Sequence, residues 1–397
     1  MRVLIFCPIL LEPGWVCSLV FSSIVGQLRG GKVDDSRRIC PSCSLDSSIF
    51  IHLNLHIPVF LTIILCLCGC SEKTVTDSPS ITELKGKALG TTWSVKVLST
   101  THFRIEDLRT DISQKLEGCD KIFSHWRPDS ELYQFNGALT TTPISIHPQL
   151  LALLKHSKWI HKQSGGTFDP TIAPVVNLWG FGPVGKTRST IPTDKQIGEA
   201  LSLTGMNKVE LLHKGLVRKK LPTLQLDFSG SAKGEIIDQI CTLLQGWNFN
   251  NFLVEIGGEV RAYGKGRNGK GWIVGLEDGS GGSNSMVSVP LRNYAVATSG
   301  TYQLNKPKPD ANRSASHLLD PRTGRPVEHD LIAVNAFAPT ARDADAWATA
   351  LMILGPVKGM KKAEELDMVA RFCSIQNGHI EISLSTAYKR LYLSNIP

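Results

Sequence analysis

The sequence of 397 residues has little of several features that would mark a specialised class of protein. It contains no run of five or more basic residues and no alternation of basic with aromatic residues, so nucleic acid is not an expected partner despite a net charge of +8. Its 35 glycines and 21 prolines follow no period, which excludes collagen and coiled coil, and 42% of its residues are hydrophobic, which excludes general disorder. A large, packed, turn-rich protein remains.

Cysteine is scarce outside the N-terminal region. Seven of the ten cysteines lie within the first 70 residues, and only Cys119, Cys241 and Cys373 lie beyond them. Three scattered cysteines do not define a disulfide framework. Cys40 and Cys43 have the C-x-x-C spacing of zinc and redox sites, but no second pair accompanies them. The uneven distribution predicts a boundary near residue 70.

An uncharged apolar run, IPVFLTIILCLC, occupies residues 57–68. Its 12 residues are too few to cross a hydrocarbon core about 30 Å thick, but they match the apolar region of a signal peptide. The next residues, Leu67-Cys68-Gly69-Cys70, resemble a bacterial lipobox, in which a cysteine after a small residue receives diacylglycerol. We therefore expect residues 1–69 to be a signal region and Cys70 to be the lipidated N-terminus after cleavage. A short buried helix ending in Gly-Cys is the alternative.

The apolar run begins far from Met1, whereas signal sequences are normally about 15 to 30 residues long. We therefore expect translation to begin near Ile49 to Leu55, with residues 1–50 upstream of the true start. The polar composition after the lipobox predicts a tether over residues 70–85. Residues 86–397 then form one large folded domain.

Apolar spacing in this domain predicts both helices and strands. Helical periods cover residues 105–123, 147–166, 194–203, 231–247 and 343–355, with a further helix after Gly355. Alternation of apolar and polar residues predicts strands at 91–98 and 331–338, three short strands within 208–229 and a C-terminal hairpin. Five further segments within 252–300 are predicted to form an antiparallel meander. The order is not a repeating βαβ pattern, so the fold class is α+β, with antiparallel and mixed sheets packed against helices.

One glycine-rich motif matches the dinucleotide-binding fingerprint but does not predict dinucleotide binding. Residues 264–269, GKGRNG, match G-x-G-x-x-G. That fingerprint requires a helix to follow, so that helical amides can hold a pyrophosphate, whereas the predicted strand GWIVGLE follows here. The motif therefore predicts a hairpin turn.

A second cluster, LDFSGSAKG at residues 226–234, leads from a strand end into a helix through small residues. Such a turn lets backbone groups approach a phosphate or a metal, while the helix N-terminus and Lys233 favour an anion. A solvated lysine at a glycine-rich helix start is the alternative.

Asp345 and Thr349 lie four residues apart on a predicted helix and hence on one face. A carboxylate and a hydroxyl are hard oxygen ligands that suit Mg²⁺. The alternative is a carboxylate that interacts with the helix dipole, a role that Asp343 could also fill. His317 precedes the turn Asp-Pro-Arg-Thr-Gly and is either a general base or a capped loop residue.

Taken in order, these segments resemble the flavin transferase family (FAD:protein FMN transferase, the ApbE family). The resemblance covers nearly all of residues 86–395. It is carried by LGTTW (89–93), SHWRPDSEL (124–132), GGTFDPT (165–171), LDFSGSAKG (226–234), EIGGEVRAYG (255–264), ATSGTY (297–302), HLLDPRTG (317–324) and ADAWATALMILG (344–355).

The resemblance implies a single large catalytic domain that cleaves FAD at its pyrophosphate with Mg²⁺, transfers FMN to a threonine hydroxyl of an acceptor protein, and releases AMP. Carried over by motif position, the metal ligands would be the carbonyl of Gly230 and the side chains of Asp345 and Thr349. The catalytic residues would be His317, as the base, together with Asp345 and Lys233. FAD would be held by Leu89, Trp126, Thr167, Phe168, Asp169, Asp227, Lys233, Ser299, Thr301 and Leu319.

Two alternatives share the same residues: an FAD pyrophosphatase, in which water replaces threonine, and a non-catalytic flavin-binding lipoprotein. By resemblance, the acceptors would be flavoprotein subunits of the sodium-pumping NADH:quinone reductase or of a related electron-transport complex. Many members of the family are exported and tethered. We therefore expect a membrane-anchored lipoprotein on the periplasmic side, at the inner membrane.

Overall fold

The computed structural model describes residues 79–100, 102–184, 191–279, 286–301, 305–307 and 314–393. The expected signal region, the lipobox with Cys70 and the first part of the expected tether lie outside these residues. The described chain enters the fold directly as strand β1, Ser80–Ala88, so the last residues of the expected tether, 80–85, are part of the sheet.

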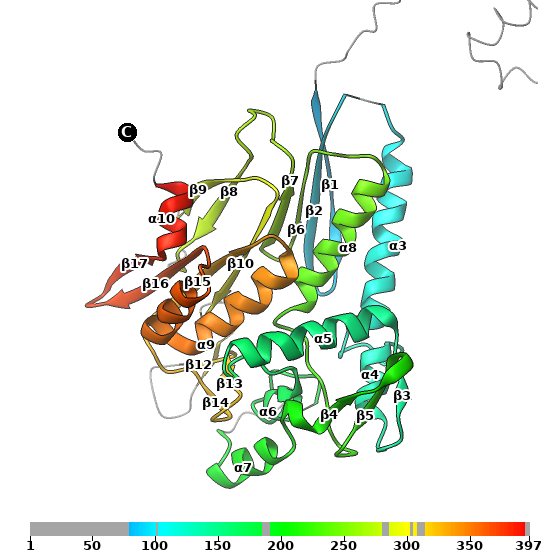
Figure 1. The fold of residues 1–397 in the computed structure, drawn as a ribbon, viewed down its shortest axis with the longest axis vertical. Helices are drawn as coiled ribbons and strands as arrows, with labels where there is room; N and C mark the ends of the chain where they lie inside the picture. The colour runs from blue at the N-terminus through cyan, green and yellow to red at the C-terminus, as the bar shows by residue number, and fades with distance from the viewer. Residues whose placement is uncertain are drawn as a thin grey trace, which may run out of the picture. The chain divides into compact units, whose positions relative to one another are not determined.

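An eight-stranded sheet organises the structure, in the order β1-β2-β6-β7-β10-β15-β16-β17, and its neighbouring strands pair antiparallel within the described residues (Figure 1). Its strands after β1 are β2 Thr91–Ser99, β6 Phe252–Ile256, β7 Glu259–Tyr263, β10 Tyr294–Gly300, β15 Leu331–Ala338, β16 Ala370–Gln376 and β17 His379–Leu384. The expected α+β class is confirmed, since helices pack on an antiparallel sheet rather than alternate with parallel strands.

The helices are α3 Ile105–Phe123, α4 Glu131–Gly137, α5 Pro148–Gln163, α6 Ala173–Leu178, α7 Asp194–Ser202, α8 Ala232–Gly246, α9 Ala341–Glu365 and α10 Thr386–Tyr392. The predicted helices at 105–123 and 194–203 match α3 and α7 almost residue for residue, because their apolar positions recur at helical spacing. The two helices expected on either side of Gly355 are one element, α9, interrupted where Gly355 adopts φ 79°.

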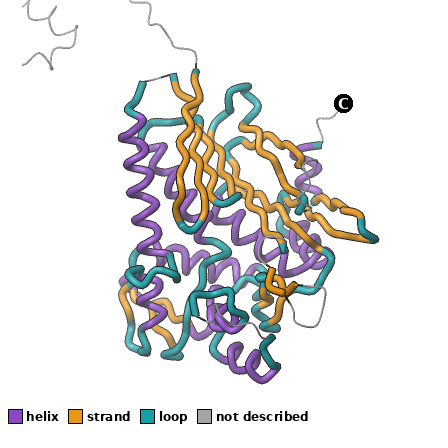
Figure 2. The backbone as a smooth tube through the Cα atoms, turned by 180° about the vertical axis from the view of Figure 1, so that it is seen from behind, coloured by secondary structure: helices purple, strands orange, loops and turns teal. Residues whose placement is uncertain are grey.

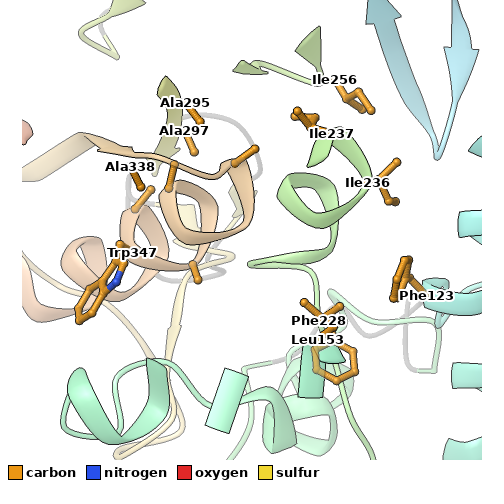
Figure 3. Packing of buried hydrophobic residues seen from close by; sticks show 14 of the residues in the cluster. Phe123, Leu153, Phe228, Ile236, Ile237, Ile256, Ala295, Ala297, Ala338 and Trp347 are labelled. Carbon is orange, nitrogen blue, oxygen red and sulfur yellow. The ribbon is translucent and has the colours of Figure 1, made fainter. Parts of the chain in front are cut away.

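The main core fills the space between one face of the sheet and helices α3, α8 and α9. Ile236 and Ile237 of α8 are buried in it, and Ala295, Ala297 and Ala338 of the sheet belong to the same cluster (Figure 3). Alanines on these strands leave room for α9 to approach the sheet closely, which brings the residues of α9 next to those of β10. Figure 2 shows the strands of the sheet in front of these helices.

The meander expected within residues 252–300 is wrong in one respect. Strands β8, Trp272–Glu277, and β9, Met286–Leu291, form their own two-stranded sheet, and β7 pairs with β10 instead. Every second residue of β8 is buried, and Trp272 packs with Leu253, Ala262 and Val296 of the main sheet. The hairpin therefore covers the second face of the sheet, where its apolar side chains are buried together with those of α10.

The remaining strands form three small sheets: β3 Ile144–Ser145 with β5 Leu216–Lys219 and β4 Val209–Leu211, β11 Asn305–Pro307 with β12 Ser314–Ser316, and β13 Leu319–Asp320 with β14 Arg325–Pro326. The strand expected at 223–229 does not form. Instead, the backbone of Leu226 exchanges two hydrogen bonds with the side chain of Asn136, at 2.7 and 2.8 Å. An amide side chain thus satisfies the groups that a partner strand would have satisfied.

Candidate active site

A cavity of about 350 Å³ opens at one end of the main sheet. Strand β7 begins here with Glu259, and β10 ends here with Thr298, Ser299 and Gly300. The start of α8, the first turns of α9 and the segments before α4 and after α5 complete the walls. Residues far apart in the sequence therefore meet at this end of the sheet.

Twelve of the residues expected at the site line this cavity. They are Trp126, Thr167, Phe168, Asp169, Asp227, Gly230, Lys233, Ser299, His317, Leu319, Asp345 and Thr349. Leu89 and Thr301 are not among the lining residues. Leu89 lies in the turn between β1 and β2 with φ 56°, and the Thr301 amide donates to the Ile332 carbonyl just beyond β10.

Three charged side chains interact in the wall of the cavity. Lys233 Nζ lies 2.8 Å from Glu259 Oε1, and the Asp345 carboxylate accepts a hydrogen bond of 3.0 Å from the Gly234 amide. Glu259 and Asp345 are each only 4% exposed. Burial raises the pKa of Glu259 to about 8 and also raises the pKa of Asp345. Burial disfavours the charged form of Lys233, but the two carboxylates outweigh this and raise its pKa.

The carboxylate of Glu259 is only half satisfied. Its Oε2 atom is buried without a hydrogen-bond partner among the described residues. A buried carboxylate with one free oxygen costs free energy unless its charge is balanced. Glu259 therefore fixes the position of the Lys233 ammonium at the cavity, and this role was not expected from the sequence. The only signal was its place within the motif EIGGEVRAYG.

The three expected metal ligands lie close together. Thr349 Oγ1 is 3.3 Å from Ser299 Oγ, and a Cβ atom built on Gly230 would lie 3.0 Å from Thr349 Oγ1. Asp345 lies one helical turn before Thr349 on α9 and also lines the cavity. No group of three His, Cys, Asp or Glu side chains suited to a metal occurs in the described part of the chain.

The donor set at this place consists of one carboxylate, one hydroxyl and the carbonyl of Gly230, where an added Cβ atom would be tightly packed. Mg²⁺ accepts few protein ligands, all of them oxygen, and retains waters or substrate phosphates. The residues present therefore fit Mg²⁺ better than a softer metal that prefers histidine and cysteine.

Histidines and carboxylates support another part of the wall. His125 Nδ1 lies 3.8 Å from Asp227, whose Oδ1 also accepts from the Ser229 amide at 2.8 Å. His161 Nδ1 lies 3.0 Å from the Phe168 carbonyl and 3.5 Å from Asp169. These contacts fix the loops on both sides of the cavity. His125 lines the cavity and was not expected there from the sequence.

Aromatic rings line the opening. Trp126 is 45% exposed, although most of the tryptophans are more buried, and its ring lies 5.4 Å from that of His125. His317 is half-buried, and its ring meets Phe181 edge-on at 6.3 Å. An exposed tryptophan at a cavity offers a flat apolar surface on which a planar ring can stack.

None of the described helices is long and apolar enough to cross a membrane.

Comparison with known proteins identifies the family of this chain. Residues 89–372 match the model of the ApbE family. The FAD:protein FMN transferase of Haemophilus influenzae is 34% identical over 343 residues, which cover 82% of this chain and 94% of that protein. That of Klebsiella pneumoniae is 33% identical and covers 75% and 86%.

Solved structures show the same fold. The flavin transferase ApbE from Vibrio cholerae superposes with a TM-score of 0.72 at 31% identity, covering 79% of this chain and 99% of that chain. The flavinyl transferase ApbE of Pseudomonas stutzeri in its apo form gives a TM-score of 0.73 at 30% identity, with coverage of 80% and 98%. By sequence and by fold, the chain belongs to the ApbE family, a family of flavin-transferring enzymes.

Proposed function

We propose that this enzyme cleaves FAD at its pyrophosphate, transfers FMN to a threonine hydroxyl of an acceptor protein and releases AMP in a Mg²⁺-dependent reaction. One observation carries the proposal: Asp345, Thr349, Gly230 and Lys233, from two helices and a loop, converge on a single cavity. The carboxylate and the hydroxyl suit a hard cation, and the ammonium of Lys233 is held beside them. Together these positive charges would suit a pyrophosphate, which carries several negative charges.

Asp345, Thr349 and the Gly230 carbonyl would hold Mg²⁺, which when bound neutralises negative charge on the pyrophosphate. Lys233, fixed by Glu259 at 2.8 Å, supplies a further positive charge beside it. A lysine held in place needs no rearrangement when charge develops in the transition state. Trp126 offers its exposed ring to a flat heterocycle at the cavity mouth.

The transfer itself balances without a further reactant. The threonine oxygen of the acceptor forms a bond to the phosphorus of the FMN half, and the bond from that phosphorus to the bridging oxygen breaks. The bridging oxygen leaves with AMP. The hydroxyl proton passes to a base, and His317, which lines the cavity, is the residue proposed for this role.

Intact-protein mass spectrometry tests this function. The full chain is incubated with FAD, Mg²⁺ and a flavin-carrying subunit of the sodium-pumping NADH:quinone reductase or of a related electron-transport complex, the acceptors that we propose. We expect the acceptor to gain the mass of FMN, and EDTA to abolish the gain. Intact FAD that stays bound would instead establish a flavin carrier.

Hydrolysis of FAD by the same residues is the second candidate, since the nucleophile comes from outside the chain. Trp126, which lines the cavity, is 45% exposed, so water reaches the cavity when no acceptor is bound. Free FMN and AMP with no gain of mass on any acceptor would favour this pyrophosphatase activity.

We also propose that Cys70 is lipidated and anchors the enzyme on the periplasmic side of the inner membrane. The apolar run and the lipobox-like residues before Cys70 support this location. Diacyl and amide-linked chains together anchor a protein stably, whereas one chain binds only marginally. Replacement of Cys70 by Ser is expected to move the protein from the membrane fraction to the soluble fraction.

A further inference from the structure

Four cationic side chains project from two neighbouring turns at the end of the sheet opposite to the cavity. Lys265, Arg267 and Lys270 lie on the turn between β7 and β8, and Arg292 lies on the turn between β9 and β10. All four are exposed. Neither turn contains an acidic residue, and no carboxylate in the described part of the chain forms an ion pair with any of them. We call these four residues the basic end.

Hydrogen bonds hold the two turns against each other and against the sheet. The Gly264 amide donates to Asn293 Oδ1 at 2.8 Å, and the Gly266 amide donates to Asn251 Oδ1 at 2.9 Å. A Cβ atom on Gly266, which has φ 62°, would lie 2.2 Å from the Gly271 carbonyl oxygen. The G-x-G-x-x-G motif therefore builds a compact turn that presents its cations in a fixed place.

The N-terminal segment joins the fold at this same end. Ser80, the first residue of β1, pairs with Ser99, and the neighbouring Leu98 amide donates to the carbonyl of Asn251 at 2.8 Å. The side chain of Asn251 is the one that holds the β7–β8 turn. Figure 1 shows this turn and the start of β1 toward the top of the view.

Acidic residues nearby do not neutralise the basic end. Glu106 and Asp107 at the start of α3 each lie near an arginine of their own segment, at 3.6 and 3.4 Å. Asp367, in the turn before β16, pairs with Arg390 at 2.7 Å. None of these three carboxylates therefore pairs with the basic end.

We propose that the basic end docks on the anionic headgroups of the membrane that carries the lipid anchor, and so turns the cavity away from that membrane. The inference rests on the proposed anchor at Cys70. Nine residues separate Cys70 from Ser80, so the anchor lies within about 35 Å of the start of β1. Clusters of basic residues so close to a membrane are attracted by its anionic lipids.

The orientation has a consequence for the acceptor. Strand β1 has nine residues and spans the sheet from the basic end to the turn at Leu89, a length of about 30 Å. The cavity would therefore face an acceptor whose threonine lies about 30 Å from the headgroups. Two exposed isoleucines beside the start of β1 and α3, Ile81 and Ile105, would lie at the membrane surface.

Hydrogen exchange on membrane-bound protein tests the docking. The protein is expressed in bacteria with its signal region, so that Cys70 can be processed, and is reconstituted on vesicles of phosphatidylcholine alone and of phosphatidylcholine with phosphatidylglycerol. Amide exchange is then compared at 264–271 and 292–293. With the anionic vesicles we expect exchange there to slow by about fivefold or more, and the effect to disappear at high salt. Exchange in β4 and β5 should not change.

Two matched variants control for general charge. In the first, all four residues of the basic end become Gln: Lys265→Gln, Arg267→Gln, Lys270→Gln and Arg292→Gln. In the second, four exposed lysines of α5, α7 and the segment after β5 become Gln: Lys155→Gln, Lys158→Gln, Lys195→Gln and Lys220→Gln. Only the first variant should lose the protection while remaining bound to the vesicles.

Equal exchange on both kinds of vesicle would overturn the docking, as would equal loss of protection in both variants. Protection that arises only when an acidic acceptor protein is added would overturn it in favour of a protein partner. Failure of the protein expressed with its signal region to fractionate with membranes or to stay on either vesicle would overturn it together with the anchor. None of these results depends on FMN transfer, so the proposed activity is tested separately.

Discussion

The two ends of the main sheet carry charge in opposite ways. At the cavity, Lys233, Glu259 and Asp345 interact with one another, and the two carboxylates are almost fully buried. At the basic end, the cations are exposed and unpaired within the described chain. Buried charges interact strongly and shift each other's pKa values, whereas exposed charges are screened within about 10 Å. Buried, interacting charges thus lie at one end of the sheet and exposed, screened charges at the other.

This difference predicts that variants at the two ends separate activity from membrane contact. The buried cluster should be sensitive to a single substitution, because removal of one charged side chain leaves its partner buried without a counter-charge. The basic end should tolerate single substitutions, because the loss of an exposed cation only lowers the net positive charge of that surface.

The largest effect is expected from Asp345→Asn. Loss of the one carboxylate in the proposed metal site should lower FMN transfer about 1,000-fold, since a preorganised charge at the reacting phosphate is removed. Initial rates of acceptor flavinylation measure the change. Removal of all four cations of the basic end should leave the same rate in solution unchanged.

Binding of FAD and thermal unfolding of Asp345→Asn serve as controls. We expect an intact fold, because Asn still accepts from the Gly234 amide and burial already opposes the charge of Asp345. An unchanged rate of transfer would remove Asp345 from the metal site.

Lys233→Met is expected to lower the free energy of unfolding by about 2 kcal/mol, because Glu259 remains buried without its cation. Urea unfolding measures this, and the exposed Lys265→Met is the matched control, with a change within about 0.5 kcal/mol. A second substitution, Glu259→Gln, should recover part of the loss. If the two lysine variants were equally stable, the contrast between the ends of the sheet would not hold.

Gly230→Ala tests how tightly the proposed ligands are packed. The new methyl would lie 3.0 Å from Thr349 Oγ1 and 3.2 Å from Phe168, so we expect about a tenfold loss of transfer. Gly118→Ala on α3 is the control, since nothing lies within 4 Å of its Cβ position and a helix favours alanine. Full activity in Gly230→Ala would show that this wall can move aside.

The smallest expected effect concerns acid stability near the start of α9. Burial acts to raise the pKa of Asp343, but hydrogen bonds from His156, at 2.6 Å, and from Thr340 outweigh it and lower the pKa. A lowered pKa in the folded state contributes stability above the ordinary value of 3.8 that is lost as pH falls through the folded value.

Wild type should therefore lose more stability than Asp343→Asn as pH falls from neutral to well below that value. Thermal melts across this range, with the variant as reference, measure the difference. Parallel curves for the two proteins would mean that the pair with His156 contributes no pH-dependent stability.

Local patterns in the sequence were enough to predict most helices. Helix α3 occupies the predicted residues 105–123, because its buried side chains recur every three or four positions. The pattern was not enough at 223–229, where alternation predicted a strand, because Asn136 satisfies the backbone of Leu226 from 90 residues away. It also could not show that β8 and β9 leave the main sheet, since alternation is the same for a strand in either sheet.

The sequence by itself determined the α+β class, the family motifs and twelve of the residues that line the cavity. The class and the motifs follow from short segments, whose residue types and spacing are present in the chain before it folds, and the twelve residues were implied by the family that these motifs resemble. Only the tertiary structure brought Glu259 to Lys233, left Leu89 and Thr301 outside the cavity lining and separated the basic end from the site. Such relations depend on which strands pair and which helices pack, and these contacts join residues that no local pattern connects.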